Sequence, residues 1–311
     1  GPGMARWQGK RVAVLYGGLS SERDVSLNTG KAIAKALEAK GHQVALVDVD
    51  REVAARLREL RIDVAFNALH GRFGEDGCIQ GLLEAMGVPY TGSGVLASAV
   101  GMDKVVSKTL FKFLGLSVAE YRVFPRSRAG EISLADLPFG LPCVVKPAGE
   151  GSSVGVSLVK EAGALGKACR EAATFKGDVI VERYVKGKEI QVAVLDGKAL
   201  GAIEVVPANE FYDYAAKYTA GTTQYFYPAR IPEDRNRAVL AAAEVAHRGL
   251  GCDGVTRTDF ILAPDGVPYI LEVNTLPGMT ATSLVPKIAK GNGIAFEDLC
   301  ERLLDGAALK A

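Results

Sequence analysis

Four polar side chains that suit a divalent cation lie on the two arms of one expected β-hairpin. Asp265-Gly266 is a typical hairpin turn, and a hairpin centred on it places Asp259 opposite Glu272. The same register places Arg257 opposite Asn274, and all four side chains then share one face. Opposed carboxylates repel each other, whereas a hard cation such as Mg²⁺ prefers oxygen ligands. We therefore predict a metal site, with a surface strand neutralised by Arg257 as the alternative.

A second hairpin signal, Asp196-Gly197, gives a useful contrast. The same register rule places Glu189 opposite Glu204. No further oxygen ligand accompanies this pair, so we predict no metal site there. Opposed carboxylates alone therefore do not define a cation site.

A glycine- and serine-rich segment at residues 149–155 has the composition of a phosphate loop. It follows Lys146 and joins two expected strands, so its backbone N–H groups could surround a phosphate. It is not the Walker pattern, because no Gly-Lys-Ser/Thr follows and the next element is a strand. A flexible hairpin loop is the alternative. Residues 92–97 match GxGxxA, but the preceding strand is short and contains Pro89, so we expect no dinucleotide fold.

The first third of the chain alternates strands and helices. We expect strands at residues 11–16, 44–49 and 63–69, with helices at 26–40 and 52–60 between them. This order predicts a parallel sheet with right-handed crossovers. Ligands of such sheets bind beyond the carboxyl ends of the strands, which here are the loops at 17–22 and 69–77. His70 lies in the second loop, although a lone histidine is more often structural.

After a further helix at 78–86 and a helical stretch to residue 115, the pattern changes to α+β. The expected elements, in chain order, are strands at 118–124, 142–146, 156–159 and 179–184, with a helix at 161–175. A third unit contains the two hairpins, a long aromatic loop at 209–227 and a helix at 233–250. We predict an α/β fold with three domains: a parallel-sheet domain at 4–102 and two α+β domains at 103–186 and 187–311. Residues 1–3, before Met4, are interpreted as a cloning remnant.

Composition limits the possible partners and compartment. Lys and Arg total 37 and Asp and Glu total 36, so the net charge is +1 and we expect no nucleic-acid partner. No apolar run reaches 18 residues and no signal peptide is recognised, so we expect no membrane segment. The five cysteines are scattered without CxxC spacing, which predicts reduced thiols and a cytoplasmic protein.

Several motifs, in order along the chain, together resemble the D-alanine–D-alanine ligase family. The first group is Gly17-Gly-Leu-Ser-Ser-Glu22-Arg-Asp-Val-Ser26-Leu, Leu69-His70-Gly71, Gly74-Glu-Asp-Gly77, Tyr90-Thr-Gly-Ser-Gly94 and Met102-Asp-Lys104. The second group is Lys146-Pro, Glu150-Gly-Ser152-Ser-Val-Gly155, Phe211-Tyr-Asp-Tyr-Ala-Ala-Lys217-Tyr218, Arg257-Thr-Asp259, Glu272-Val-Asn274-Thr-Leu-Pro-Gly278-Met-Thr and Ser283-Leu-Val-Pro. The resemblance runs from residue 11 to about residue 304, nearly the whole chain.

The resemblance implies an ATP-grasp fold, in which two α+β domains clasp ATP behind an N-terminal parallel-sheet domain. It implies the reaction ATP + 2 D-alanine → D-alanyl-D-alanine + ADP + phosphate, through an acyl phosphate, for peptidoglycan precursors. It also implies two Mg²⁺ ions, with Mn²⁺ as a possible substitute, and a cytoplasmic homodimer. The 209–227 loop becomes a lid that excludes water from the acyl phosphate.

The resemblance also assigns roles to individual residues. The metal ligands are Asp259, Glu272 and Asn274. The ATP-binding residues are Lys104, Lys146, Ser152, Ser153, Glu182, Tyr184, Val185, Glu189 and Lys217. The D-alanine-binding residues are Glu22, His70, Lys217, Ser283 and Leu284. The catalytic set is Glu22, Ser152, Tyr218, Arg257 and Gly278, in which Glu22, Ser152 and Tyr218 form a hydrogen-bonded triad.

Two alternative functions are weighed against this one. A related ligase could use D-lactate or D-serine as the second substrate, and Tyr218 in the lid argues against D-lactate. A nucleotide-binding regulator without catalytic activity is the alternative from another class. The intact set of Arg257, Asp259, Glu272 and Asn274 argues against it.

Overall fold

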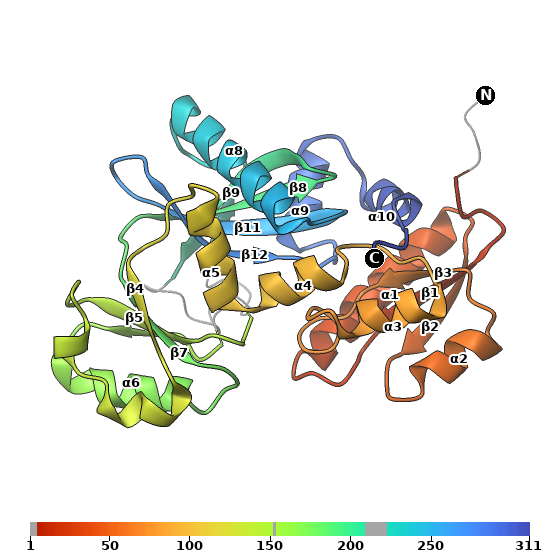
Figure 1. Ribbon diagram of the computed structural model, residues 1–311. Coiled ribbons are helices and arrows are strands. Elements are labelled where there is room, and N and C mark those ends of the chain that lie inside the picture. Colours follow the sequence, from red (N-terminus) through yellow and green to blue (C-terminus); the bar gives the residue numbers. More distant parts are fainter. Residues whose placement is uncertain (1–4, 152–153, 209–222) are drawn as a thin grey trace.

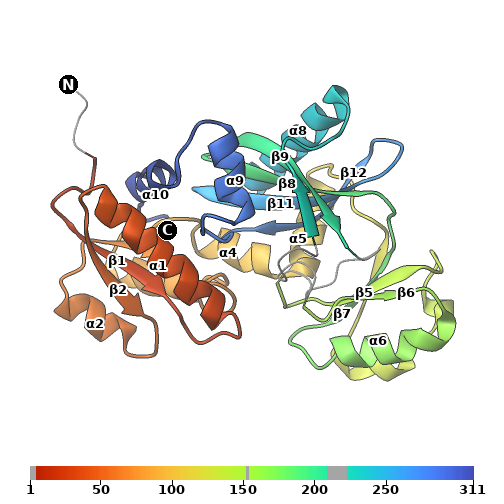
Figure 2. The ribbon, with the colours of Figure 1, turned by 180° about the vertical axis from the view of Figure 1, so that it is seen from behind.

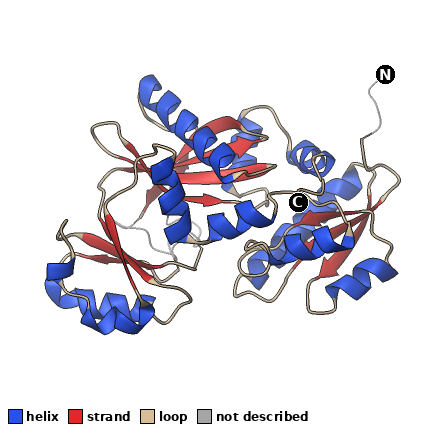
Figure 3. Ribbon diagram, in the orientation of Figure 1, coloured by secondary structure: helices blue, strands red, loops and turns tan. Residues whose placement is uncertain are grey.

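The computed structural model describes residues 5–151, 154–208 and 223–311. Three sheets succeed one another along the chain, each with its own helices (Figure 1). Figure 3 shows that each sheet has helices beside it and that two helices lie in the middle of the molecule, among the three sheets. The sequence-based domain boundaries at 102/103 and 186/187 stay a prediction.

The N-terminal sheet is parallel, as predicted. Its strands are β1 (Arg11–Tyr16), β2 (Gln43–Asp48) and β3 (Val64–Asn67), in the spatial order β2-β1-β3. The helices of this part are α1 (Arg23–Ala39), α2 (Val53–Glu59) and α3 (Cys78–Met86). Strand β1 lies at the centre and its residues 12–15 are completely buried. The loops after β1 and β3 therefore meet at one edge of the sheet.

Two helices, and not one helical stretch, follow the N-terminal sheet. They are α4 (Val95–Met102) and α5 (Lys104–Phe113). The break falls at Asp103, whose carboxylate accepts hydrogen bonds of 2.9 Å from the backbone N–H groups of Val105 and Val106. Asp103 is thus the N-cap of α5, and its extended backbone ends α4.

The central sheet is antiparallel and has the order β4-β7-β5-β6. Its strands are β4 (Tyr121–Phe124), β5 (Cys143–Pro147), β6 (Ser157–Val159) and β7 (Val179–Arg183). Helix α6 (Leu165–Ala172) packs on one face, where the alternate residues Cys143, Val145 and Val181 join it in a buried cluster. Short 3₁₀ helices occur at Arg126–Glu131, Leu134–Asp136 and Ala162–Ala164. The opposite face therefore carries Lys146 and Glu182.

The C-terminal sheet has the order β10-β9-β8-β11-β12 and is also antiparallel. Its strands are β8 (Lys188–Leu195), β9 (Lys198–Pro207), β10 (Thr223–Phe226), β11 (Val255–Leu262) and β12 (Pro268–Asn274). Helix α8 (Glu233–Leu250) packs on one face, and α9 (Leu284–Gly291) and α10 (Phe296–Asp305) lie on the other side (Figures 1 and 2). The predicted loop at 209–227 is therefore too long, because its end forms β10; residues 209–222 lie outside the described part.

The β11–β12 hairpin has the predicted register at the candidate metal ligands. Arg257 pairs with Asn274, and Asp259 pairs with Glu272. A β-bulge follows directly, since Phe260 pairs with Ile270 and not with Leu271. The four polar residues lie beyond this bulge and so keep a common face.

The β8–β9 hairpin contradicts the predicted register. A bulge between Ala193 and Val194 shifts the pairing, so Glu189 lies opposite Val205 and Glu204 lies opposite Ile190. The two carboxylates therefore point to opposite faces of the sheet. Glu204 instead forms a bidentate ion pair with Arg230, with distances of 3.1 and 2.9 Å.

The N-terminal and C-terminal parts contact each other closely. His42 Nε2 lies 2.8 Å from the Glu301 carboxylate of α10, and Tyr90 pairs with Ala308 near the end of the chain. No helix in the described residues is long and apolar enough to cross a membrane.

Candidate active site

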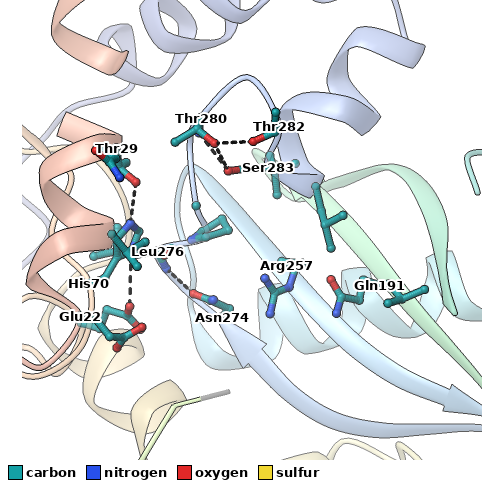
Figure 4. A pocket seen from close by; sticks show the side chains of 18 of the residues that line it. Glu22, Thr29, His70, Gln191, Arg257, Asn274, Leu276, Thr280, Thr282 and Ser283 are labelled. Carbon is teal, nitrogen blue, oxygen red and sulfur yellow. Dashed lines mark hydrogen bonds and ion pairs between the residues drawn. The ribbon is translucent and has the colours of Figure 1, made fainter. Parts of the chain in front are cut away.

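A cavity of about 350 Å³ lies between the N-terminal part and the C-terminal sheet (Figure 4). Its N-terminal wall comes from the start of α1 and the loop after β3. Its C-terminal wall comes from all five strands of the C-terminal sheet, the segment after β12 and the start of α9. The lining includes seven of the predicted residues: Glu22, His70, Arg257, Asn274, Gly278, Ser283 and Leu284. The volume is at the lower end for ligand pockets, which favours a small substrate.

One end of the cavity is acidic. Glu22, at the N-cap position of α1, is partly buried and lies near Glu75. Burial, and then the charge of Glu75, raise the pKa of Glu22 to about 7, against a lowering by His70. Gly71 lets this carboxylate approach the loop, because a Cβ there would lie 2.7 Å from Glu22 Oε2. An ammonium group is the natural ligand of this end, since it would favour ionised Glu22.

His70 is buried and links the two walls of the cavity. Its Nδ1 lies 3.1 Å from the Leu276 carbonyl, and its Nε2 lies 3.0 Å from the Thr29 hydroxyl (Figure 4). A carbonyl can only accept, so Nδ1 carries the proton. In the neutral ring, Nε2 then accepts from Thr29. His70 thereby fixes the position of the loop after β12 against α1.

The other end of the cavity carries the N-terminus of α9. Ser283 is the N-cap residue, but its side chain makes no cap hydrogen bond. Its Oγ accepts from the Thr280 N–H at 3.0 Å and lies 2.8 Å from the Thr280 hydroxyl. The backbone N–H groups of Leu284 and Val285, in the first turn, have no partner within the helix, and both residues line the cavity. This end is suited to a carboxylate.

The predicted cation ligands lie beside the cavity on the face of the C-terminal sheet. Arg257 forms two hydrogen bonds to Asp259, at 2.9 and 3.0 Å, and Asp259 is almost completely buried. Asn274 Oδ1 accepts from the Leu276 N–H at 3.0 Å, which orients the amide oxygen. Arg257 thus pairs with a carboxylate, and the predicted opposition of Asp259 and Glu272 is confirmed, whereas the metal site stays a prediction.

This donor set fits a hard divalent cation. It consists of two carboxylates and one amide oxygen, the ligands that Mg²⁺ prefers. No group of three or more His, Cys, Asp or Glu side chains in residues 5–151, 154–208 and 223–311 has metal-binding geometry. The candidate set contains only two such side chains, and Asn274 supplies the third ligand.

Basic side chains gather between the central sheet and the C-terminal sheet. Lys104 and Lys146 are both almost completely buried. The Lys104 ammonium donates to the Glu150 carbonyl, and Lys146 Nζ lies 2.5 Å from Glu182 Oε1. Burial lowers the pKa of both lysines, and the charge of Glu272 acts on both. We call the region around Lys104 and Lys146 the lysine groove. A small cavity of about 30 Å³ beside it is lined by Lys104 and by the carboxylate residues Glu22, Glu75, Glu150 and Glu272.

The remaining predicted ATP-binding residues follow β7. Tyr184 and Val185 are partly buried, and the Tyr184 N–H donates to the Pro142 carbonyl at 3.2 Å. Glu189, on β8, is almost completely buried and accepts from Gln191 Nε2 at 3.2 Å. Four predicted residues lie outside the described part of the chain: Ser152, Ser153, Lys217 and Tyr218.

Sequence reasoning missed three residues that the structure places at the site. Glu75 belongs to a quoted motif but received no role. Gln191 lines the cavity and is two residues after Glu189 on the same face of β8, so strand alternation could have found it. Lys108 is four residues after Lys104 on α5, so helical spacing could have found it.

Comparisons with known proteins agree with this geometry. Residues 110–305 match the family described as D-ala D-ala ligase C-terminus, and residues 11–56 and 53–93 match the family described as D-ala D-ala ligase N-terminus. The chain is 76% identical over 308 residues to the D-alanine–D-alanine ligase of Anaeromyxobacter sp. (strain Fw109-5), with 99% of this chain and 100% of the relative covered.

Two solved structures are similar over nearly the whole chain. The D-alanine–D-alanine ligase of Bacillus anthracis complexed with ATP has a TM-score of 0.83 and 31% identity, over 96% of this chain and 97% of that one. The VanG D-Ala:D-Ser ligase of Enterococcus faecalis has a TM-score of 0.82 and 29% identity, over 94% and 98%. The sheet arrangement and these similarities confirm the predicted ATP-grasp fold. The chain therefore belongs to the D-alanine–D-alanine ligase family.

Proposed function

We propose that this protein joins two D-alanine molecules to D-alanyl-D-alanine with ATP, through an acyl phosphate, and thereby supplies a peptidoglycan precursor. The observation that carries the proposal is the charge arrangement of the 350 Å³ cavity. It has carboxylates at one end and a helix N-terminus at the other, and the buried Lys104 lines a smaller cavity beside it. A dipeptide with a free ammonium and a free carboxylate matches the two ends.

The amino-acid substrates would occupy the two ends in order. The ammonium of the first D-alanine would lie at Glu22, close to His70. The carboxylate of the second D-alanine would accept from Ser283 and from the Leu284 N–H at the start of α9. Lys217, from the segment outside the described residues, would complete this end.

The nucleotide would lie between the central and C-terminal sheets. Lys104 and Lys146 would contact the phosphates, together with Ser152, Ser153 and Lys217 of the undescribed segments. The adenine and ribose would lie against four residues next to these lysines: Glu182, Tyr184, Val185 and Glu189. Support comes from the two buried ammonium groups, which supply the cations that phosphate oxygens bind.

Catalysis would depend mainly on positioning and positive charge. A carboxylate oxygen of the first D-alanine attacks the γ-phosphorus of ATP, and ADP leaves. The neutral amine of the second D-alanine then attacks the acyl carbon, and inorganic phosphate leaves. Arg257 and the Gly278 N–H would stabilise the developing oxyanion. Glu22, Ser152 and Tyr218 would form the triad that closes the lid over the site.

Asp259, Glu272 and Asn274 would hold two Mg²⁺ ions, or Mn²⁺ in their place. When bound, these ions neutralise phosphate charge and help orient the transferred phosphoryl group. The number of ions is part of the proposal.

The family resemblance further suggests a cytoplasmic homodimer and the domain division given above.

The test is ADP release with Mg²⁺, ATP and a panel of amino acids. We expect turnover with D-alanine and none with L-alanine, and D-alanyl-D-alanine as the product. Equal turnover with L-alanine, or none with D-alanine, would reject the proposal. D-Serine as second substrate deserves a separate arm, because the VanG D-Ala:D-Ser ligase has nearly the same fold. Preferential formation of D-alanyl-D-serine would replace the proposed acceptor.

A further inference from the structure

One carboxylate of the nucleotide groove bridges two buried ammonium groups. Glu182 Oε1 lies 2.5 Å from Lys146 Nζ, and Glu182 Oε2 lies 2.9 Å from Lys108 Nζ. The three side chains are 5%, 8% and 1% exposed, in the order Glu182, Lys146, Lys108. They come from different elements, because Lys108 is on α5, Lys146 on β5 and Glu182 on β7. Lys108 thus connects a linking helix to the central sheet.

Two buried ammonium groups share the Glu182 carboxylate. Lys104, one turn before Lys108 on α5, is a third buried lysine, and the charge of Glu272 acts on Lys104 and Lys146. A buried charge is costly unless it is paired. A hydrophobic side chain at position 108 would fill the same space without this cost. The second lysine on Glu182 therefore calls for a functional reason, and the placement of Lys146 for an anionic ligand supplies one.

Electrostatics agree with the geometry. Burial raises the pKa of Glu182, but the charges of Lys108 and Lys146 outweigh burial and lower it to about 2. Glu182 is therefore ionised at neutral pH. Lys108 itself lines neither the 350 Å³ nor the 30 Å³ cavity. Its influence on a ligand would pass through Glu182 and Lys146.

We infer that Lys108 is a positioning residue for the nucleotide: it fixes Glu182, which in turn holds the Lys146 ammonium where the phosphates bind. The inference rests on the proposed function, since it assumes that ATP occupies this groove. It adds a role for a residue that would not itself contact the nucleotide.

The test compares KM for ATP and for D-alanine in Lys108→Met and Lys108→Arg. We expect Lys108→Met to raise KM for ATP about tenfold, the effect of one hydrogen bond to a charged group, and to leave KM for D-alanine nearly unchanged. Lys108→Arg keeps the charge and should recover part of the loss. The ATP-induced rise in Tm, measured with Mg²⁺ present, should shrink in the same order.

The matched control is Lys112→Met. Lys112 is one turn further along α5 and exposed, and its Nζ lies 5.7 Å from the Tyr121 ring centroid, close to the 5.4 Å of Lys108. Lys112→Met therefore removes a lysine and its contact with Tyr121 but leaves the Lys108–Glu182 ion pair in place. We expect wild-type kinetics from it.

A double-mutant cycle with Glu182→Gln tests the route of the effect. If Lys108 acts through Glu182, then Lys108→Met should change KM for ATP little in the Glu182→Gln background. Additive effects would overturn the inference. So would a Lys108→Met variant with lowered Tm but wild-type KM for ATP, which would show a structural role only. Failure of the wild-type protein to bind ATP would instead reject the proposed function, so the two failures are distinguishable.

Discussion

The acidic end of the substrate cavity and the lysine groove beside it are both partly or fully buried, yet a glutamate in each has neighbours of opposite charge. At the acidic end, Glu22 faces Glu75 and its pKa is raised to about 7. In the groove, Glu182 faces Lys108 and Lys146 and its pKa is lowered to about 2. Burial raises the pKa of both carboxylates, so the difference comes from their neighbours.

This difference indicates what each region binds. A carboxylate with a raised pKa gains most from a cationic ligand, and a cluster of buried ammonium groups favours an anion. An ammonium group at Glu22 and phosphates at the lysines satisfy both. The two regions meet at Glu272, whose charge acts on Glu22, Lys104 and Lys146.

The largest effect is expected from Glu272→Gln, because Glu272 belongs to the candidate metal site and links both regions. Turnover should fall by roughly 10³-fold, while the fold persists because the side chain keeps its shape. ADP release should be measured over a wide range of Mg²⁺ concentrations. Circular dichroism and Tm serve as the control for folding. Near-normal rates at ordinary Mg²⁺ would show that the β11–β12 carboxylates do not act as proposed.

Lys146→Met should have the next largest effect, since it removes positive charge from the groove only. We expect kcat/KM for ATP to fall by roughly 10²-fold, at the upper end for a hydrogen bond to a charged group. The matched control is Lys167→Met on α6, which covers the opposite face of the same sheet and is 79% exposed. An equal loss in both variants would contradict the assignment of the groove to the nucleotide.

The parts of the fold that local pattern decides were predictable from the sequence. Strand β1 and helices α3 and α8 have the predicted bounds, because apolar periodicity and glycine stops define them. The α4–α5 break was missed, because apolar residues continue on both sides and the deciding event is capping by Asp103. A helix boundary that depends on the hydrogen bonds of one side chain is harder to predict from the spacing of apolar residues.

The two hairpins show why site geometry is harder to predict. In β8–β9, one bulge moved Glu189 away from the predicted partner. In β11–β12, the turn is also displaced: the Ala263 N–H donates to the Val267 carbonyl, so the loop holds three residues and not two. The bulge near Asp259 compensates for that displacement. The predicted Asp259–Glu272 pair is correct only because the longer turn and the bulge shift the pairing by one residue in opposite directions. The sequence reveals neither shift.

The acidic end should produce a pH dependence. An ionised Glu22 binds the substrate ammonium, so protonation below a pKa of about 7 removes the charge. We therefore expect kcat/KM for D-alanine to fall about tenfold per pH unit below pH 7 and to level off above it. The kcat/KM for ATP at saturating D-alanine should lack this limb at the same pH, because Glu182 stays ionised. If kcat/KM for both substrates fell in the same way below pH 7, or if neither fell, the contrast between the two regions would be contradicted.

The smallest effect is expected from Glu75→Gln, which sharpens the contrast by removing one charge from the acidic end. Glu75 Oε1 accepts from the Gly71 N–H at 3.0 Å, and glutamine keeps that acceptor, so the loop should hold its position. The charge of Glu75 raises the pKa of Glu22, so its removal lowers that pKa. The acid limb of kcat/KM for D-alanine should move to lower pH by on the order of one unit or less, and burial should keep it above the ordinary range of a glutamate.

The measurement for Glu75→Gln is the complete pH profile, because the plateau and the midpoint carry different information. Below pH 7 the variant should be more active relative to its own plateau than the wild type, whereas at high pH both should be constant. Glu38→Gln, an exposed position on α1, is the control and should leave the profile unchanged. A limb that stays at pH 7, or that moves to higher pH, would mean that a group other than Glu22 titrates there. The ammonium of the first D-alanine would then have to be assigned to a different partner.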